Sequence, residues 1–138
     1  MIKIYKPMGR DWLNYKVTQS NPLTFHHIKK KCEGGKETLD NGCLLTEIGH
    51  QYVHLIEHRD RDTYITLNKM FKIINEQQSA PTKEQREIIE YLLQEFEREH
   101  KNDKNSKGKT LLQYKYLKRE WYHWKMNWHL NKRDLFRI

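Results

Sequence analysis

The fold is decided by residues 23–58, LTFHHIKKKCEGGKETLDNGCLLTEIGHQYVHLIEH. Residues 23–28 are apolar and rich in side chains that favour strands, and residues 42–45 form a second short apolar run. Between them, residues 29–40 are polar and contain a glycine pair, which is typical of a loop with tight backbone geometry. This half of the stretch therefore predicts a strand, a loop and a second strand.

A helix is expected directly after the second strand. Thr46 is a suitable N-cap, and Glu47 places a negative charge in the first turn, where the helix dipole favours one. Residues 47–58 then show helical periodicity, because four apolar side chains share one face: Ile48, Tyr52, Leu55 and Ile56. The charged residues 59–63 predict a break between this helix and the next.

Two further helices are expected over residues 66–77 and 82–100. Their buried faces should hold Leu67, Met70, Phe71 and Ile74 in the first, and Ile88, Ile89, Leu92, Leu93 and Phe96 in the second. Residues 101–109 form a polar linker. A last helix should begin near residue 110 and carry an apolar stripe of Tyr114, Leu117, Trp121, Trp124 and Trp128.

The predicted fold class is therefore α+β. We expect residues 1–65 to hold the N-terminal segment and the strand–loop–strand–helix core, and residues 66–100 to form a helical pair that packs on this core. Residues 110–138 would form a basic, aromatic-rich C-terminal helix. This helix could pack on the core, or it could contact DNA or a protein partner.

Charge and composition narrow the classes of function. The chain has 138 residues and a net charge of +8, and residues 104–138 carry ten Lys or Arg against two Asp or Glu. Such a surface attracts polyanions, nucleic acid first, although a solubilising tail has the same composition. No apolar run is long enough for a membrane span, and the N-terminus has no secretory signal, so we expect a cytoplasmic protein without a membrane partner. Cys32 and Cys43 form no CxxC pair, which favours reduced thiols.

Five of the eight histidines lie within residues 23–58: His26, His27, His50, His54 and His58. His50 and His54 are four residues apart on the predicted helix, so they lie on one side of it and can hold one ion. A third ligand can come from the adjacent strand, and three imidazoles suit zinc or nickel while leaving a coordination position open. The remaining histidine of the adjacent pair could then act as general base, and the Asn41 amide could fix the loop.

The pattern His-His, then Asn, then His-xxx-His resembles the HNH endonucleases, also called His-Me finger or ββα-metal nucleases. The spacing is most similar to that of the colicin-type DNases, and the surrounding residues resemble small HNH proteins of bacteriophages and mobile elements. The resemblance covers residues 21–58. It lacks the CxxC pairs that bind a zinc ion in many members of the family.

This resemblance implies a role for each residue of the motif. His27 would be the general base, Asn41 the orienting asparagine, and the metal ligands would be His26, His50 and His54. The implied reaction is hydrolysis of a DNA phosphodiester, by nicking or cleavage, with one divalent metal ion: zinc, nickel, magnesium or manganese. The implied setting is a bacterial cell, with the chain encoded by a phage or a mobile element.

Several alternatives remain open at this stage. The histidines could form a structural zinc clip or no site, and the helical ligand pair could shift to His54 and His58. Glu57 is expected to be a charge on the helix face. Double-stranded DNA is the expected partner, with RNA as an alternative substrate, and candidate contacts are Lys29, Lys30, Lys31, Arg59, Arg61, Lys115, Lys118, Arg119 and Lys125. A protein that uses the same scaffold to bind DNA or a host defence protein, without turnover, is the competing hypothesis.

Overall fold

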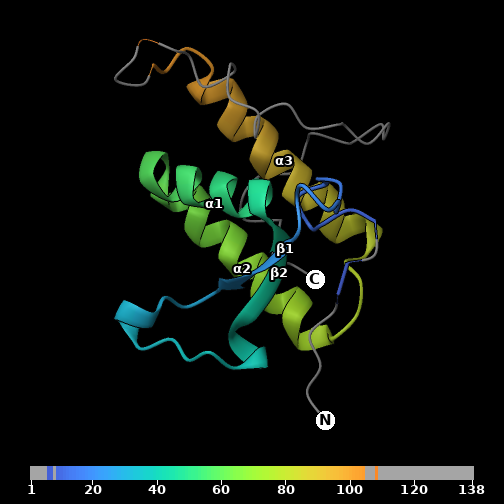
Figure 1. Ribbon diagram of the computed structural model, residues 1–138. Coiled ribbons are helices and arrows are strands. Elements are labelled where there is room, and N and C mark those ends of the chain that lie inside the picture. Colours follow the sequence, from blue (N-terminus) through green and yellow to red (C-terminus); the bar gives the residue numbers. More distant parts are fainter. Residues whose placement is uncertain (1–5, 8, 105–107, 109–138) are drawn as a thin grey trace.

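The computed structural model describes residues 6–7, 9–104 and 108 (Figure 1). This part of the chain is a small α+β domain with a two-stranded antiparallel sheet and three α-helices. The elements follow in the order β1 (Leu23–His27), η1 (Lys31–Glu33), η2 (Leu39–Asn41), β2 (Gly42–Thr46), α1 (Glu47–Arg59), α2 (Arg61–Gln77) and α3 (Lys83–His100), where η marks a short 3-10 helix. The expected order of strand, loop, strand and helix is confirmed.

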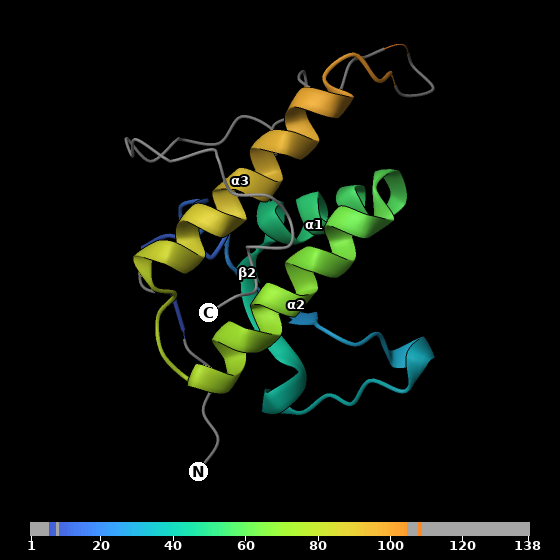
Figure 2. The same cartoon turned by 180° about the vertical axis from the view of Figure 1, so that it is seen from behind.

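The two strands form a hairpin whose register sets the position of the histidines. Leu23 pairs with Thr46 at one end, and His27 pairs with Gly42 at the other. Side chains alternate along a strand, so His26 and His27 leave β1 in different directions, but His27 is the last residue of the strand and both side chains line one pocket. His26 faces the helices and contacts Phe71 of α2, whereas the His27 ring packs against Phe25. The loop between the strands projects away from α1 and α3 (Figures 1 and 2).

Helix α1 begins where the sequence predicts it, and the side-chain carboxylate of Asp11 in the N-terminal segment hydrogen-bonds its N-cap residue. Thr46 is the N-cap, and its hydroxyl accepts a hydrogen bond from the Gly49 backbone. The same hydroxyl donates to the buried carboxylate of Asp11 over 2.6 Å, and the Thr46 backbone N–H donates to it over 2.9 Å. The other Asp11 oxygen accepts from the backbone of Leu13 and Tyr15, so one buried carboxylate joins the N-terminal segment to the start of α1.

The break predicted over residues 59–63 is confirmed at Asp60 but is too long, because α1 ends at Arg59 and α2 begins at Arg61. The Asp60 carboxylate caps α2 by accepting from the backbone N–H and the hydroxyl of Thr63. The charged residues after it therefore form the first turn of α2 rather than a loop. The expected boundary between residues 65 and 66 falls inside this helix.

All three helices contribute to one apolar core. The apolar positions predicted on α2 and α3 are all buried, and Thr82 caps α3 in a reciprocal capping box with Gln85. The core also contains three side chains of the irregular N-terminal segment that show no periodicity: Trp12, Leu13 and Tyr15. In the described part of the chain, no helix is long and apolar enough to cross a membrane.

Candidate functional site

The four histidines predicted as site residues line one pocket between the hairpin and α1. The pocket has a volume of 380 Å³ and is lined by His26, His27, His50, His54, Lys30, Lys31, Cys32 and Tyr64. The rings of His50 and His54 stack with centroids 4.7 Å apart, and the His26 ring meets them edge-on at 5.3 and 6.3 Å. His58 does not line this pocket, so the expected alternative pair of His54 and His58 is not what the fold brings together.

His26 is the buried member of the trio, with 2% of its surface exposed. Burial lowers its pKa to about 4, and the charge of His50 and His54 acts in the same direction, although a hydrogen bond to Asn68 opposes the shift. His26 is therefore a neutral imidazole at neutral pH, which is the form that binds metals.

Asn68 of α2 determines which nitrogen of His26 carries the proton. Its side-chain oxygen lies 2.9 Å from His26 Nε2, and its amide also hydrogen-bonds the Tyr64 side chain. Since the amide has one accepting and one donating end, the oxygen accepts from His26 Nε2–H while the NH₂ faces Tyr64. The lone pair of His26 is then on Nδ1.

Thr24 fixes His50 in the same manner. The Thr24 hydroxyl donates its proton to the Leu45 carbonyl over 3.0 Å, so it can only accept from His50 Nδ1, also 3.0 Å away. The lone pair of His50 is therefore on Nε2. Burial and the neighbouring His54 and His27 lower the His50 pKa, which favours the neutral ring.

Glu57 fixes His54, and its position corrects the expectation that it is a charge on the helix face. Glu57 is buried, with its carboxylate 3.3 Å from His54 Nδ1 and in an ion pair with Lys30. Burial alone raises the pKa of Glu57, but the hydrogen bonds from Lys30 and His54 outweigh it and lower the pKa. An ionised carboxylate only accepts, so His54 carries its proton on Nδ1 and its lone pair on Nε2.

The three imidazoles are the kind of donor set that a divalent metal ion such as zinc or nickel takes. Each of the three rings is hydrogen-bonded through one nitrogen and keeps a lone pair on the other, which is the arrangement of metal-ligating histidines. The ligand nitrogens of the trio do not all lie within 4.8 Å of one another. Among the described residues, the group of His, Cys, Asp and Glu ligand atoms that meets this distance is Asp60, Glu99 and His100. Zinc binding requires ligand nitrogens about 3.3 Å from each other, so the His54 side chain, which is 49% exposed, would have to turn toward the other two rings.

The cluster of Asp60, Glu99 and His100 has a structural explanation in the helix ends. Both oxygens of Asp60 already cap α2 through Thr63. His100 Nδ1 lies 2.7 Å from the carboxylate of Asp103, and its ring packs on Phe96. The cluster therefore joins the C-terminus of α3 to the N-terminus of α2.

His27 lines the same pocket, but its ring is separate from the trio. Its Nε2 is buried and forms no hydrogen bond with any described residue, and the Glu37 carboxylate lies 3.8 Å away. Glu37 itself forms an ion pair with Lys31. An imidazole that is beside the ligands but engaged by none of them can accept a proton.

Asn41 occupies the place expected for a residue that fixes the loop. Its side-chain oxygen accepts from the Lys29 backbone N–H over 2.8 Å, and its NH₂ donates to the carbonyls of Lys29 and Lys36, each over 2.9 Å. Its backbone carbonyl accepts from Ile28. These bonds close the loop immediately after His27 and hold the end of β1 in place.

The candidate DNA contacts fall into three groups. Lys30, Lys31 and Arg61 each have a carboxylate partner, namely Glu57, Glu37 and Glu33. Lys29 and Arg59 are exposed. The candidates of the C-terminal helix lie outside the described residues, as does that helix: Lys115, Lys118, Arg119 and Lys125.

Sequence reasoning missed Asn68, Thr24 and Asp11. Asn68 is 42 residues from the histidine it orients, and no local pattern marks such a contact.

Comparison of the chain with protein-family models, with curated proteins and with solved structures gave no match.

Proposed function

We propose that the chain is a metal-dependent endonuclease of the HNH type that nicks or cleaves DNA. One observation carries the proposal: the lone pairs of His26, His50 and His54 are each set by a hydrogen bond on the opposite ring nitrogen, and His27 beside them has an Nε2 without a hydrogen bond in the described part of the chain. A structural zinc clip needs the three ligands but has no use for the fourth imidazole.

The residues divide the chemistry between them. A divalent ion held by the trio would neutralise charge on the scissile phosphate and on the leaving oxygen. His27 takes a proton from a water molecule as its oxygen attacks phosphorus, and the bond from phosphorus to the leaving oxygen breaks. Asn41 keeps the loop closed so that His27 stays beside the pocket, and the expected product carries a 5′-phosphate.

The direct test is cleavage of supercoiled plasmid DNA by the full chain with added Zn²⁺, Ni²⁺, Mg²⁺ or Mn²⁺, and with EDTA. Wild type should cleave with metal and stop with EDTA. His54→Ala should lose both metal binding and cleavage, whereas His58→Ala, one turn further along α1 and outside the pocket, should keep both. Cleavage in EDTA, or equal cleavage by His54→Ala, would refute the proposal.

The competing proposal is a binding protein that uses the same scaffold. It predicts that the wild-type chain binds metal and DNA but leaves plasmid and RNA intact under every metal condition. Parallel digestion of an RNA and a DNA duplex in the same assay distinguishes the two nuclease substrates.

A further inference from the structure

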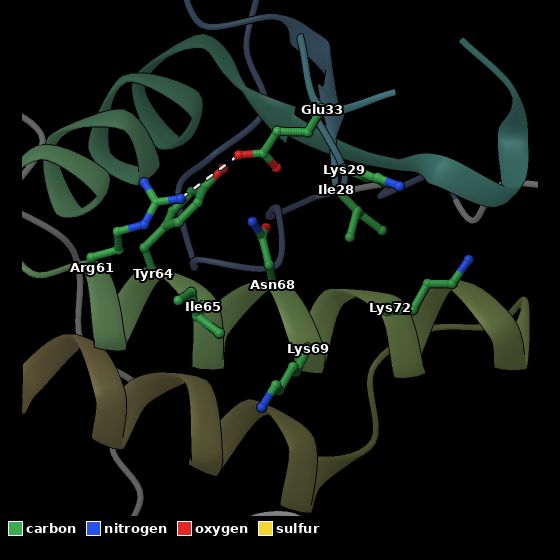
Figure 3. A pocket seen from close by; sticks show the side chains of 9 residues that line it. All are labelled: Ile28, Lys29, Glu33, Arg61, Tyr64, Ile65, Asn68, Lys69 and Lys72. Carbon is green, nitrogen blue, oxygen red and sulfur yellow. Dashed lines mark ion pairs between the residues drawn. The ribbon is translucent and has the colours of Figure 1, made fainter. Parts of the chain in front are cut away.

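A second hollow lies next to the histidine pocket and is lined by cations. It has a volume of 280 Å³ between α2 and the chain that follows β1 (Figure 3). Its lining includes four positive side chains, Lys29, Arg61, Lys69 and Lys72, against the single carboxylate of Glu33. Arg61 lies at one end of the hollow, and Lys29 and Lys72 lie at the other (Figure 3).

The hollow has an elongated shape because it follows α2. Arg61, Ile65, Asn68 and Lys72 are spaced by four, three and four residues, so they form one stripe along the helix. From residue 61 to residue 72 the helix rises about 16 Å. One strand of a DNA duplex places about five phosphates along that length, at roughly 3.4 Å of axis each.

The lining also has apolar surface of a kind that suits the sugars of a nucleic acid. Ile65 is 42% exposed and is one of two large hydrophobic side chains exposed in the described part of the chain. It lines the hollow together with Ile28, between the cations. Cations at the ends with an apolar middle match a chain that alternates phosphates and sugars.

Two side chains connect this hollow to the histidine pocket. Tyr64 lines both. Asn68, four residues on, points from α2 into the hollow and accepts from His26 Nε2 (Figure 3). A strand lying along α2 would therefore meet Tyr64 and then the imidazoles.

We propose that this groove binds the phosphate backbone of double-stranded DNA on one side of the bond that is cut. The site of cutting rests on the proposed nuclease function, but the binding does not. Lys69 and Lys72 are the new contacts, and Lys29 and Arg61 gain a defined place in the same track. Lys69 is exposed and forms no ion pair with any described residue. Lys72 donates to the Asp40 carbonyl over 2.6 Å and lies 3.9 Å from a Glu76 oxygen.

The test measures binding of a short DNA duplex in EDTA, so that no turnover occurs, over a range of salt concentrations. Each lost phosphate contact should reduce the slope of log K against log salt by about 0.9, so Lys69→Gln with Lys72→Gln should reduce it by about 1.8. If the variant and wild type bind equally at 1 M salt, this slope change corresponds to about 30-fold weaker binding at 0.15 M. The single variant Lys69→Gln keeps the bond from Lys72 to Asp40 and should reduce the slope by about 0.9.

The matched control is Lys83→Gln with Lys101→Gln, which removes the same charge from exposed positions that line neither pocket. Its slope should stay within a few tenths of the wild-type value. An equal reduction of the slope in the control, or an unchanged slope in the Lys69 and Lys72 variant, would overturn the proposal that this groove binds DNA. If wild type fails to cut plasmid in every metal while the slope still falls as expected, the nuclease proposal fails and the groove stands.

Discussion

The most informative single substitution at the site is Glu57→Gln. It removes the negative charge that hydrogen-bonds His54, while the side chain at position 57 keeps its shape. The Glu57 side chain is 5% exposed, lies 3.3 Å from His54 Nδ1 and pairs with Lys30. Replacing the carboxylate by an amide turns a charge-assisted hydrogen bond into a neutral one, about half as strong. Loss of such an outer partner lowers metal affinity by roughly 10- to 100-fold, or about 1.4–2.7 kcal/mol.

The assay is competition for Zn²⁺ between the protein and a coloured chelator, with Glu47→Gln as the control. Glu47 is exposed in the first turn of the same helix and does not line the pocket. Folding should be little affected by Glu57→Gln, since Lys30 is 34% exposed and water can solvate its freed amino group. Wild-type affinity in Glu57→Gln, or an equal loss in Glu47→Gln, would refute the orienting role of Glu57.

Three other predictions concern the scaffold. Gly35→Ala should lower both the melting temperature and the cleavage rate, because its Cβ would lie 1.7 Å from the Lys29 carbonyl oxygen in the loop that Asn41 closes. Gly49→Ala should destabilise the fold by roughly 1–3 kcal/mol in denaturant titrations, since the new Cβ would lie 2.5 Å from the Asp11 carboxylate and break its buried hydrogen bonds; a gain of stability, as expected for a free helical glycine, would contradict this. In EDTA, the free energy of unfolding should fall by about 3 kcal/mol from pH 6.5 to pH 4, because the unfolded chain protonates His26 near 6.5 and the folded chain only near its lowered pKa of about 4; His26→Gln should lack this component.

Local signals were sufficient for much of the fold. Periodicity placed the buried faces of α2 and α3, and the capping residue Thr46 marked the start of α1. The spacing of the histidines was enough to predict that His26, His50 and His54 would meet, because four residues on a helix and one register on a hairpin bring them together.

The sequence could not supply the contacts that depend on tertiary packing. Asn68 and Glu57 look like ordinary polar positions of helices, and only packing against β1 and the loop shows that they orient ligands. Residues 59–63 look like a break because they are charged. In the structure, the cap formed by Asp60 allows the chain to turn within one residue. The irregular segment around Trp12 enters the core without any periodic pattern, so its burial was not predictable.

The role of His27 as general base is tested by the rate at which His27→Ala cleaves plasmid DNA with saturating metal. His27 is not one of the proposed metal ligands, so the variant should bind Zn²⁺ as tightly as wild type. Loss of a general base should lower the cleavage rate by about 10²- to 10⁴-fold. A His27→Ala protein that cleaves at the wild-type rate would contradict the account.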